Sequence, residues 1–456
     1  MTKMKKFLIL MLLMLVLTIP IQSNTGMTNK TNSAPISDSR RTSDLSESGP
    51  VLIDSILDFS TWNGSGTAEE PYVMESMRIT STDETPCIRI KDVPDVYYEI
   101  RYCEISGSIY EGSGQHVGID PVGSAIYIES GHATIVECTI SNSSVGISLK
   151  GGASDLIDND ISGIEKGVYI ESDNTNLSGN EISVEKDRCI DMAYGENITV
   201  TSCTLRTLGA FEISTGIYAD NVALLNITDC SFGGLDIIIG DDAIVDSTFI
   251  TSSTDIMSIN VGPYCIGACF ISSNGIIGRP DLGLKGYWGI YVFDVAAAVV
   301  LESNSIQDCG KGIQTMSDST AIVQNAVENC TIGIALDGYY NIVRNNTITG
   351  NEKGIVVTGE NNWIFYNIFQ SNILSAVDNG LNNIWDDAIQ LGNFYDDFPS
   401  THSGQYHVNG TAGSIDRWPV YIGAPENGIG LLVIGIIALA VFSVVTGAVF
   451  IFAKRR

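Results

Sequence analysis

The sequence predicts an all-β protein, a single-stranded right-handed parallel β-helix of about 11–13 coils. Three observations predict this fold. Charged residues make up only 17% of the 456 residues, whereas glycine occurs 46 times, so residues that favour helices are scarce. Short segments of alternating apolar and polar residues are separated by turn residues. The third observation is a short pattern that returns every 21–23 residues, the length of one β-helix coil.

The first repeated pattern is a small residue followed by Ile or Val, any residue and usually an aliphatic one. Because its spacing is mostly 21 residues, these side chains would stack from coil to coil and form the core of a β-helix over residues 51–380. A leucine-rich repeat has a similar length, but it needs leucines at fixed positions that this chain lacks. The pattern begins at Ala125, Gly146, Gly167, Cys189, Gly312, Gly333 and Gly354.

The second repeated pattern is an Asn or Cys followed two residues later by an apolar residue. We expect it at a corner of the coil, where Asn amides form a hydrogen-bonded ladder and a buried Cys acts as a small apolar residue. Neighbouring coils lie about 4.8 Å apart, which a disulfide can bridge. Cys309 with Cys330 and Cys203 with Cys230 are therefore candidate disulfides, and buried thiols are the alternative. The pattern holds Cys103, Cys138, Asn159, Asn180, Cys203, Cys230, Cys269, Asn304, Asn325, Asn346 and Asn367.

The N-terminus has the pattern of a secretory signal peptide. Three lysines precede an apolar run at residues 7–19 and polar residues follow, so residues 1–23 are assigned to a signal peptide, with an uncleaved anchor as the alternative. Residues 24–50 are rich in Ser, Thr and Asn and bury too little apolar surface to fold, so they are predicted to be a disordered linker. Either form of the N-terminus implies that the protein is exported.

The C-terminus has the pattern of a membrane span. Residues 429–452 carry no charged side chain, are long enough to cross a bilayer as a helix, and are followed by a basic end. We therefore predict a transmembrane helix at 428–453 and a cytoplasmic tail at 454–456. The predicted location is the cell membrane, with one span, the N-terminal ectodomain outside and the basic C-terminus in the cytoplasm.

The chain is strongly acidic. It has 53 Asp and Glu against 24 Lys and Arg, a net charge of −29, which argues against binding to a nucleic-acid backbone. Acidic side chains gather where the repeat becomes irregular, and a bound Ca²⁺ is one hypothesis for them. No Ca²⁺-binding loop motif is present, so a solvated acidic surface is the alternative. The residues are Asp236, Asp241, Asp242, Asp246 and Asp255.

Two small groups of residues are candidates for binding sites. A long interruption of the repeat predicts a loop whose aromatic and basic side chains suit a glycan, with the covering of an exposed coil as the alternative. This group is Arg279, Lys285, Tyr287 and Trp288. His402 and His407 lie near each other in the sequence and are the candidate metal ligands, with ordinary loop residues as the alternative.

The ends of the β-helix carry a family resemblance. The segment GSGTAEEPY from Gly64, the Asn-rich coils and an aromatic and acidic segment at 381–427 resemble the NosD-like family of exported right-handed parallel β-helix proteins, which includes archaeal surface proteins. The resemblance covers residues 51–422 and implies that 381–427 caps the β-helix. The cap residues are Trp385, Asp386, Asp387, Gly392, Asn393, Tyr395, Asp397, Asp416, Arg417, Trp418 and Pro419.

The resemblance leaves several functions open. The family includes a periplasmic copper-processing accessory protein, and its fold is shared with carbohydrate-binding proteins and with sugar hydrolases, lyases and epimerases. We expect a membrane-anchored extracellular protein that is structural or that binds a cell-surface glycan or surface-layer component. The alternatives are a polysaccharide lyase, epimerase or hydrolase acting on acidic glycans, and a copper accessory protein. No catalytic residue is assigned, because the outward-facing Lys and Arg share no single register.

Overall fold

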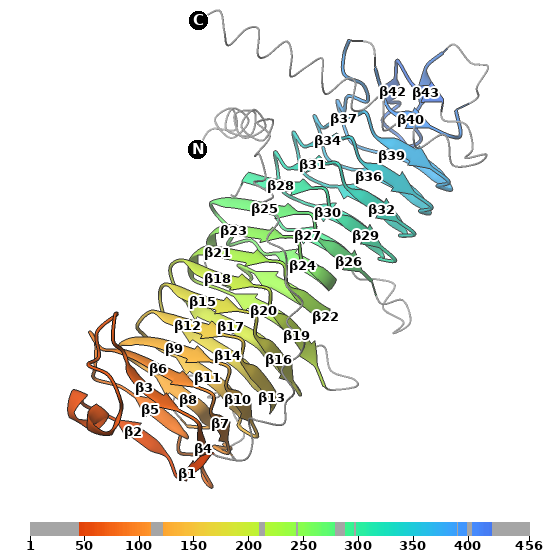
Figure 1. Cartoon of the computed structure of the whole chain (residues 1–456). Coiled ribbons are helices and arrows are strands. Elements are labelled where there is room, and N and C mark those ends of the chain that lie inside the picture. Colours follow the sequence, from red (N-terminus) through yellow and green to blue (C-terminus); the bar gives the residue numbers. More distant parts are fainter. Residues whose placement is uncertain are drawn as a thin grey trace, which may run out of the picture.

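The computed structural model forms one elongated rod of parallel strands, stacked in chain order from the red N-terminal end to the blue C-terminal end (Figure 1). The predicted signal peptide, transmembrane helix and cytoplasmic tail, at 1–23, 428–453 and 454–456, lie outside the residues that the structure describes. Those residues are 45–110, 122–208, 215–242, 245–278, 288–295, 298–389, 391–398 and 404–421, with only the backbone at 246 and 255. Among them, no helix is long and apolar enough to cross a membrane.

The rod is an all-β right-handed parallel β-solenoid of about 14 turns. The sequence predicted 11–13 coils, and the difference arises because segments at both ends also pair with the solenoid. At the N-terminal end, β1 (Ser46–Ser48) pairs in parallel with residues 77–79. This pairing corrects the predicted linker, which was expected to stay disordered up to residue 50. At the C-terminal end, β43 (Val420–Tyr421) pairs with residues 394–395.

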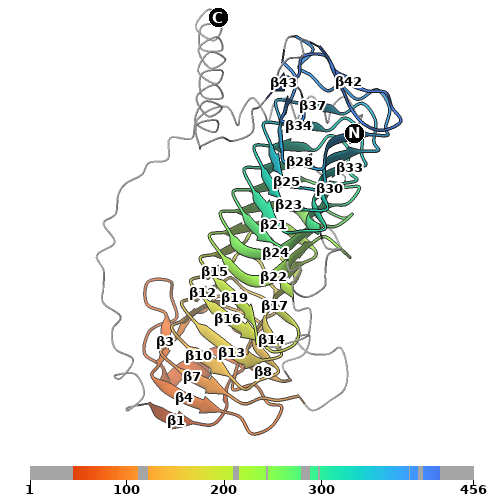
Figure 2. The same cartoon turned by 90° about the vertical axis from the view of Figure 1, so that its right-hand side faces the viewer.

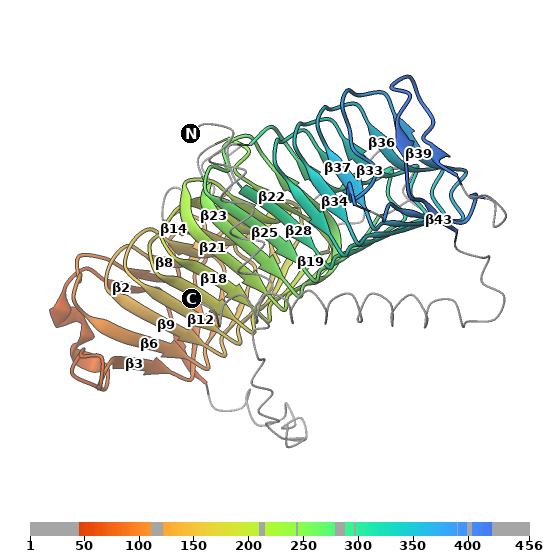
Figure 3. The same ribbon diagram turned by 90° about the horizontal axis from the view of Figure 1, so that it is seen from above.

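One side of the rod is a 13-stranded parallel sheet, seen edge-on as a regular stack in Figure 3. Its strands are β3 (Tyr72–Glu75), β6 (Tyr97–Arg101), β9 (His132–Val136), β12 (Ser154–Ile157), β15 (Thr175–Ser178), β18 (Ile198–Thr201), β21 (Val222–Thr228), β23 (Val245–Thr251), β25 (Ala268–Ser272), β28 (Ala298–Glu302), β31 (Ala321–Val323), β34 (Ile342–Arg344) and β37 (Trp363–Phe365). A short 3-10 helix, η2 (Ile56–Thr61), lies at the N-terminal end, where its Phe59 is buried and stacks on Tyr72.

The other strands form two rows that join into one 28-stranded sheet. The first row is β1, β4 (Met77–Thr80), β7 (Glu104–Ser106), β10 (Thr139–Ser141), β13 (Asp160–Ile164), β16 (Glu181–Val184), β19 (Thr204–Thr207), β26 (Gly275–Ile277), β29 (Ser305–Gln307), β32 (Ala326–Glu328), β35 (Thr347–Thr349), β38 (Ile368–Gln370), β40 (Phe394–Tyr395) and β43. The second row is β2 (Val51–Ile53), β5 (Ile88–Ile90), β8 (Ser124–Ile128), β11 (Val145–Leu149), β14 (Lys166–Glu171), β17 (Arg188–Tyr194), β20 (Thr215–Ala219), β27 (Trp288–Val292), β30 (Lys311–Thr315), β33 (Ile332–Leu336), β36 (Lys353–Val357) and β39 (Leu374–Asp378).

Two long strands near the middle of the rod connect these rows. β22 (Ser231–Ile239) pairs with β19 of the first row and β20 of the second, and β24 (Thr254–Val261) likewise pairs with β26 and β27. The register shifts within β22 where it pairs with β24. The described residues within 234–255, where the sequence departs from the 21-residue spacing, therefore remain part of the solenoid.

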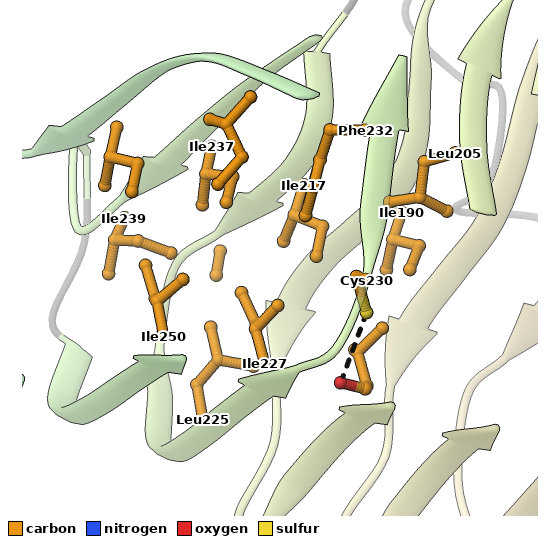
Figure 4. Packing of buried hydrophobic residues seen from close by; sticks show 14 of the residues in the cluster. Ile190, Leu205, Ile217, Leu225, Ile227, Cys230, Phe232, Ile237, Ile239 and Ile250 are labelled. Atoms are coloured by element: carbon orange, nitrogen blue, oxygen red, sulfur yellow. Dashed lines mark hydrogen bonds between the residues drawn. The ribbon is translucent and has the colours of Figure 1, made fainter. Parts of the chain in front are cut away.

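The interior of the rod is filled by apolar side chains that stack from turn to turn. In the second row, Ile126 pairs with Ile147, which pairs with Val168, and each of the three is fully buried. Figure 4 shows the same packing farther along, where Ile190, Ile217 and Ile237 project into the interior. The small residue before these positions is needed for space, because a Cβ on Gly312 would lie 2.4 Å from the Val327 side chain. The first repeated pattern is therefore the core.

The corner after a strand of the 13-stranded sheet carries an asparagine ladder in many turns. Asn346 shows the contacts of one rung: its Oδ1 accepts from the backbone N–H of Asn325 at 2.9 Å, and its Nδ2 donates to Asn367 Oδ1 at 2.9 Å. The same Nδ2 also donates to the carbonyl oxygen of Ile322. Each amide thus supplies partners to buried polar groups of two neighbouring turns. The hydrogen-bonded positions of this ladder are Asn159 and Asn180, and then Ser253, Asn274, Asn304, Asn325, Asn346, Asn367, Asn393 and Asp416.

One predicted member of this ladder is misplaced. Cys269 lies within β25, in register with Thr248 and Val299, and the corner of that turn is Asn274, whose N–H donates to Asn304 Oδ1. The preceding corner is Ser253, whose N–H donates to Asn274 Oδ1. The sequence pattern admitted only Asn or Cys, so it passed over the serine.

The thiol corners differ from the predicted disulfides. Cys203, Cys230, Cys309 and Cys330 are buried free thiols in the structure, so the two candidate disulfides are not formed. Each Sγ instead lies against a backbone carbonyl, as Cys203 does at 3.6 Å from the oxygen of Leu177. Stacking still brings the thiols of neighbouring turns together, because Thr201 and Thr204 pair with Thr228 and Ser231.

The predicted cap closes the C-terminal end of the rod. Trp385 is fully buried and its Nε1 donates to Asp378 Oδ2 at 2.8 Å. Asp386 is also buried and accepts from both Nε and Nη2 of Arg417. Burial favours the neutral acid of Asp386, but the hydrogen bonds from Arg417 outweigh it and lower its pKa.

The remaining cap residues extend this closure. Asn393 ends the Asn ladder against Asp416, and Tyr395 stacks between Phe369 and Tyr406. Asp387 and Asp397 accept hydrogen bonds from the hydroxyls of Tyr366 and Tyr406. Arg417 lies over the Trp418 ring, and a Cβ on Gly392 would meet the Asp416 carboxylate. Pro419 directly precedes β43 at the end of the cap.

Candidate functional site

The second row presents one continuous line of outward-facing side chains, which we call the outer face. Its strands run along the rod through β14, β17 and β22 in Figure 2. Between the buried positions of each strand, one residue points outward and is in register with the same position of the next turn. This line is rich in tyrosines and polar residues: Tyr127, Ser148, Tyr169, Asp191, Tyr218, Ile238, Asn260, Tyr291, Gln314 and Ala335.

The N-terminal stretch of the outer face is charged, and its centre is Asp191. This carboxylate is buried and accepts from Lys166 Nζ and, at 2.7 Å, from Arg188 Nη1. The Arg188 guanidinium also lies 3.5 Å from the centre of the Tyr218 ring. Burial raises the pKa of Tyr169 beside this cluster, and the charge of Asp191 adds to the effect, so the phenol stays protonated.

A second group of carboxylates lies one and two turns farther along. Tyr218 donates from its hydroxyl to Asp242 Oδ2 at 2.8 Å, and burial with the nearby Asp220 and Asp242 raises the pKa of Tyr218. Asp236 is buried, and although Ser258 donates a hydrogen bond to it, burial raises the pKa of Asp236 to about 6. We call this stretch the charged part: Lys150, Lys166, Tyr169, Glu171, Asp187, Arg188, Asp191, Tyr218, Asp220, Asp236, Asp241 and Asp242.

The next stretch of the outer face is aromatic. Trp288 and Tyr291 lie on β27 with their rings stacked at 4.8 Å, and Tyr291 meets the edge of the Phe293 ring at 5.6 Å. Phe293 is 39% exposed, and Met316 at the equivalent place of the next turn is 40% exposed. Aromatic side chains of a soluble protein are costly to expose, so a contiguous group of this kind commonly marks a binding surface.

Polar groups on the following turns border these rings. Gln314 on β30 is the hub, because its Oε1 accepts from Trp288 Nε1 and from Lys311 Nζ. Its Nε2 donates to Asp337 Oδ2 at 2.6 Å, and Asp337 also accepts from the hydroxyl of Thr358. These seven residues are the aromatic part of the outer face: Trp288, Tyr291, Phe293, Lys311, Gln314, Met316 and Asp337.

Only part of the predicted ligand-binding group falls on described residues. Trp288 begins β27 and belongs to the aromatic part, whereas Arg279, Lys285 and Tyr287 lie outside the described residues. The sequence missed Tyr291, Gln314 and Asp337. Gln314 and Asp337 follow Trp288 by one and two turns, so register with a repeat of 21–23 residues was the signal that could have found them.

The predicted metal-binding groups are not assembled by the described residues. His407 is an exposed residue of β41 (Tyr406–His407), which pairs with β42 (Ile415–Asp416), and His402 lies outside the described residues. In the predicted acidic group, Asp236 accepts a hydrogen bond from Ser258, and Asp242 accepts one from Tyr218. The side chains of residues 246 and 255 lie outside the described part of the structure. Within the described ranges, no three His, Cys, Asp or Glu side chains come together as a metal site.

Comparison with known proteins places the chain among β-helix proteins. Residues 197–400 match the family model described as periplasmic copper-binding protein (NosD), and residues 87–235 match the right-handed β-helix region model. The predicted NosD-like resemblance is confirmed. No curated protein matches this chain.

Three solved structures are similar to this chain at low identity. The Arthrobacter chlorophenolicus A6 DFA-IIIase in complex with GF2 is 13% identical with a TM-score of 0.31, covering 70% of this chain and 91% of its own. The Azotobacter vinelandii mannuronan C-5 epimerase AlgE6 A-module is 10% identical with a TM-score of 0.28, covering 78% and 84%. The tailspike protein gp49 of Acinetobacter baumannii bacteriophage Fri1, a capsular polysaccharide depolymerase, is 12% identical with a TM-score of 0.27, covering 75% and 52%.

The copper chemistry named for NosD does not fit the described residues. Copper would need accessible thiolates, imidazoles or thioethers held together. Here the thiols lie in the rod interior, and burial raises the pKa of Cys189 to about 12 and that of Cys87 to about 11. His132 is stacked on Tyr97 on the 13-stranded sheet, and His407 lies in the cap. We therefore derive no step through copper.

Proposed function

We propose that the protein is an exported β-helix that binds a glycan on the outer face, with the aromatic part as its main contact. The observation that carries this proposal is the grouping of Trp288, Tyr291 and Phe293 on one turn, next to the Gln314 and Asp337 hydrogen-bonding groups. A sugar ring offers apolar C–H faces and hydroxyl groups. Half-exposed aromatic rings pack against the C–H faces, and amide and carboxylate groups form hydrogen bonds with the hydroxyl groups.

The repeat of the solenoid suits a polymeric ligand. Equivalent positions of successive turns are spaced by about 4.8 Å, so side chains on the outer face form a regular line along the rod. A chain of sugars can contact several turns at once, and each contact adds to the affinity because the rod is already ordered. Binding therefore needs no deep pocket.

The test is binding of the full-length protein, purified in a detergent without a sugar head group, to a panel of neutral and acidic polysaccharides. Affinity electrophoresis measures binding, reducing-end and unsaturated-product assays measure chain cleavage, and elemental analysis measures bound copper. Binding without turnover supports the proposal. Turnover above background supports the enzyme alternative, and stoichiometric copper would support the accessory role.

Trp288→Ala should weaken glycan binding at least about tenfold, because truncating a central aromatic contact commonly costs 2 kcal/mol or more. Tyr97→Ala is the matched control. Tyr97 is also stacked on a neighbouring ring, that of His132 at 4.2 Å, but it lies on the 13-stranded sheet and not on the outer face. Equal loss in both variants would contradict the assignment of binding to the aromatic part.

A polysaccharide-cleaving or epimerising enzyme is the second candidate, and Asp236 is the observation that favours it. A buried carboxyl with a pKa of about 6 can hold or release a proton near neutral pH, as a general acid or base must. Tyr218 lies one turn away and Arg188 two turns away as further polar groups. Activity that rises and falls with pH around 6, and is lost in Asp236→Asn, would establish this function.

The proposed location is the cell surface, with the apolar stretch at 429–452 as the membrane span. The full-length protein should stay with membranes after a carbonate wash, whereas a chain ending at residue 421 should be released. The Ca²⁺ hypothesis also remains a proposal, and glycan binding measured with added Ca²⁺ and with chelator tests it. A difference between these two conditions that is removed by Asp241→Asn would support bound Ca²⁺ near the charged part.

A further inference from the structure

We propose that the glycan recognised by the outer face is neutral, and that the charged part excludes polymers of sugar acids. This inference rests on the proposed function and names the class of its ligand. It differs from the acidic glycans expected for the enzyme alternative. The observations that carry it are the charges of the two parts and the way in which each cation of the charged part is already engaged.

The charged part has more acidic than basic groups. Its basic side chains are Lys150, Lys166 and Arg188. Its acidic side chains are Glu171, Asp187, Asp191, Asp220, Asp236, Asp241 and Asp242. Seven acids therefore face three cations, on a chain whose net charge is −29. A polyanion laid along this stretch would meet like charges at close range, which is unfavourable by several kcal/mol.

The three cations have carboxylate partners of their own. Lys150 forms an ion pair with Glu171. Lys166 forms an ion pair with Asp191, and its Nζ also lies 3.5 Å from Asp187 Oδ2. Arg188 bonds Asp191 on one side and lies over the Tyr218 ring. A sugar carboxylate would have to displace these buried or half-buried pairs before it could be bound. Breaking such a pair leaves an uncompensated charge behind and costs free energy.

The aromatic part is close to neutral. Its one lysine, Lys311, donates to Gln314 Oε1, and its one carboxylate, Asp337, is held by Gln314 and Thr358. The apolar surface of Trp288, Phe293 and Met316 contributes no charge. Its chemistry matches a ligand that offers hydroxyl groups and C–H faces, namely a neutral hexose chain. The two parts together give attraction for neutral chains and repulsion of acidic ones.

The experiment compares neutral and acidic polymers at two salt concentrations. Full-length protein in a sugar-free detergent is titrated with laminarin and mannan, which are neutral, and with alginate and polygalacturonate, which are acidic. The inference predicts affinity for a neutral polymer that changes less than about twofold between roughly 20 and 150 mM NaCl, because an uncharged contact is not screened. Acidic polymers should bind at least about tenfold more weakly at the lower salt.

Charge reversal locates the exclusion. Asp241→Lys adds a cation to the exposed edge of the charged part and should raise the ratio of alginate binding to neutral-polymer binding at low salt at least about threefold. Asp155→Lys makes the same charge change on the 13-stranded sheet and should have no such effect. The two variants thus separate a local effect from a change of total charge.

The outcomes distinguish this inference from the proposed function. Tighter binding of an acidic polymer than of any neutral one overturns the inference and leaves glycan binding intact. An identical response of Asp241→Lys and Asp155→Lys, or no response of either, overturns the assignment of exclusion to the charged part. Binding of neither class of polymer overturns both the inference and the proposed function.

Discussion

The two halves of the rod solve the same structural problem with different residues. In the half from β7 to β22, corners of the ladder hold thiols at Cys103, Cys138, Cys203 and Cys230, and the outer face is charged. In the half from β26 to β39, the same corner holds Asn in every turn, and the outer face is aromatic. The core positions, by contrast, are mostly Ile or Val in both halves.

The C-terminal half also has more amide ladders. A second ladder joins Asn341, Asn362 and Asn383 through backbone N–H groups that donate to the next Oδ1, and a third joins Cys330, Asn351 and Asn372. Amide corners satisfy buried backbone groups, and the turns from Asn304 through Asn325 and Asn346 to Asn367 are each 21 residues apart. Thiol corners fill apolar space at the corner, and the turns that contain them vary in length.

The comparison shows that the core and the outer face are under separate constraints. Inward positions must match their neighbours in volume, so they change little from turn to turn. Outward positions do not pack into the interior of the rod, and they change from Asp191 to Tyr291 while the inward positions of the same strands remain apolar. A binding surface can therefore be composed on one side of the solenoid while the fold stays constant.

The largest expected effect is loss of an amide corner. Asn346→Ala removes the Oδ1 that accepts from both the backbone N–H and the Nδ2 of Asn325. It also removes the Nδ2 that donates to the Ile322 carbonyl, so all three groups lose a partner in the buried interior. We expect a loss of about 3–5 kcal/mol in the free energy of unfolding, measured by urea denaturation.

Asn176→Ala is the matched control for this change. Asn176 lies on the surface of β15 and makes a single 3.4 Å hydrogen bond to Asp155, so its truncation should change stability by no more than about 0.5 kcal/mol. Similar losses in the two variants would contradict the claim that the ladder stabilises the C-terminal half.

The next effect is the pH dependence that Asp236 gives to the charged half. Its pKa is about 6 in the folded protein and lower when unfolded, so the folded state holds its proton more tightly. Stability from this group is present below pH 4 and is lost as the pH rises from about 4 to 6, by roughly 3 kcal/mol. Asp236→Asn should remove this decline, and unfolding measured at several pH values would show it.

The exposed Asp155 provides the control for the pH experiment. Asp155→Asn should leave the pH profile of stability unchanged, since Asp155 lies at the surface of the 13-stranded sheet. A wild-type stability that does not decline between pH 4 and 6, relative to Asp236→Asn, would show that the Asp236 proton is not retained in the fold.

The smallest expected effect comes from exchanging one type of corner for the other. Cys138→Asn should be tolerated within about 1 kcal/mol, because the backbone N–H of Cys138 already bonds Asn159 Oδ1 and a new amide would extend that ladder by one turn. Cys138→Ala should cost roughly 1–2 kcal/mol, because it leaves a small void in the core. A larger loss for Asn than for Ala would show that the two corners are not interchangeable.

Much of the fold could be predicted from the sequence, because stacked apolar positions must recur at the period of the turn. The Ile and Val positions and the main Asn ladder from Asn304 to Asn367 follow from that period, whereas the C-terminal cap was implied by the family resemblance. Prediction failed at Ser253, where a serine replaces the expected Asn or Cys, and in the next turn, where Cys269 was chosen although the corner is Asn274. The choice between disulfides and free thiols was left open, because sequence spacing alone does not fix the direction in which an Sγ points.

The site was harder to predict for the same physical reason. Trp288 stands out by its type, but Gln314 and Asp337 contact it and each other only because the turns stack in register. Outward side chains need not match their neighbours, so they leave no periodic trace in the sequence. These outward side chains can be grouped only when the register of every turn is known.

The central claim is that the aromatic part of the outer face binds the glycan, and side-chain footprinting tests it most directly. The full-length protein is exposed to hydroxyl radicals with and without the polysaccharide that binds it, and oxidation of each aromatic and Met side chain is measured by mass spectrometry. We predict that the polymer protects Trp288, Phe293 and Met316, while Tyr102 and Trp363 are oxidised equally in both samples. Protection of Trp363 on the 13-stranded sheet with none at Trp288 would contradict the claim.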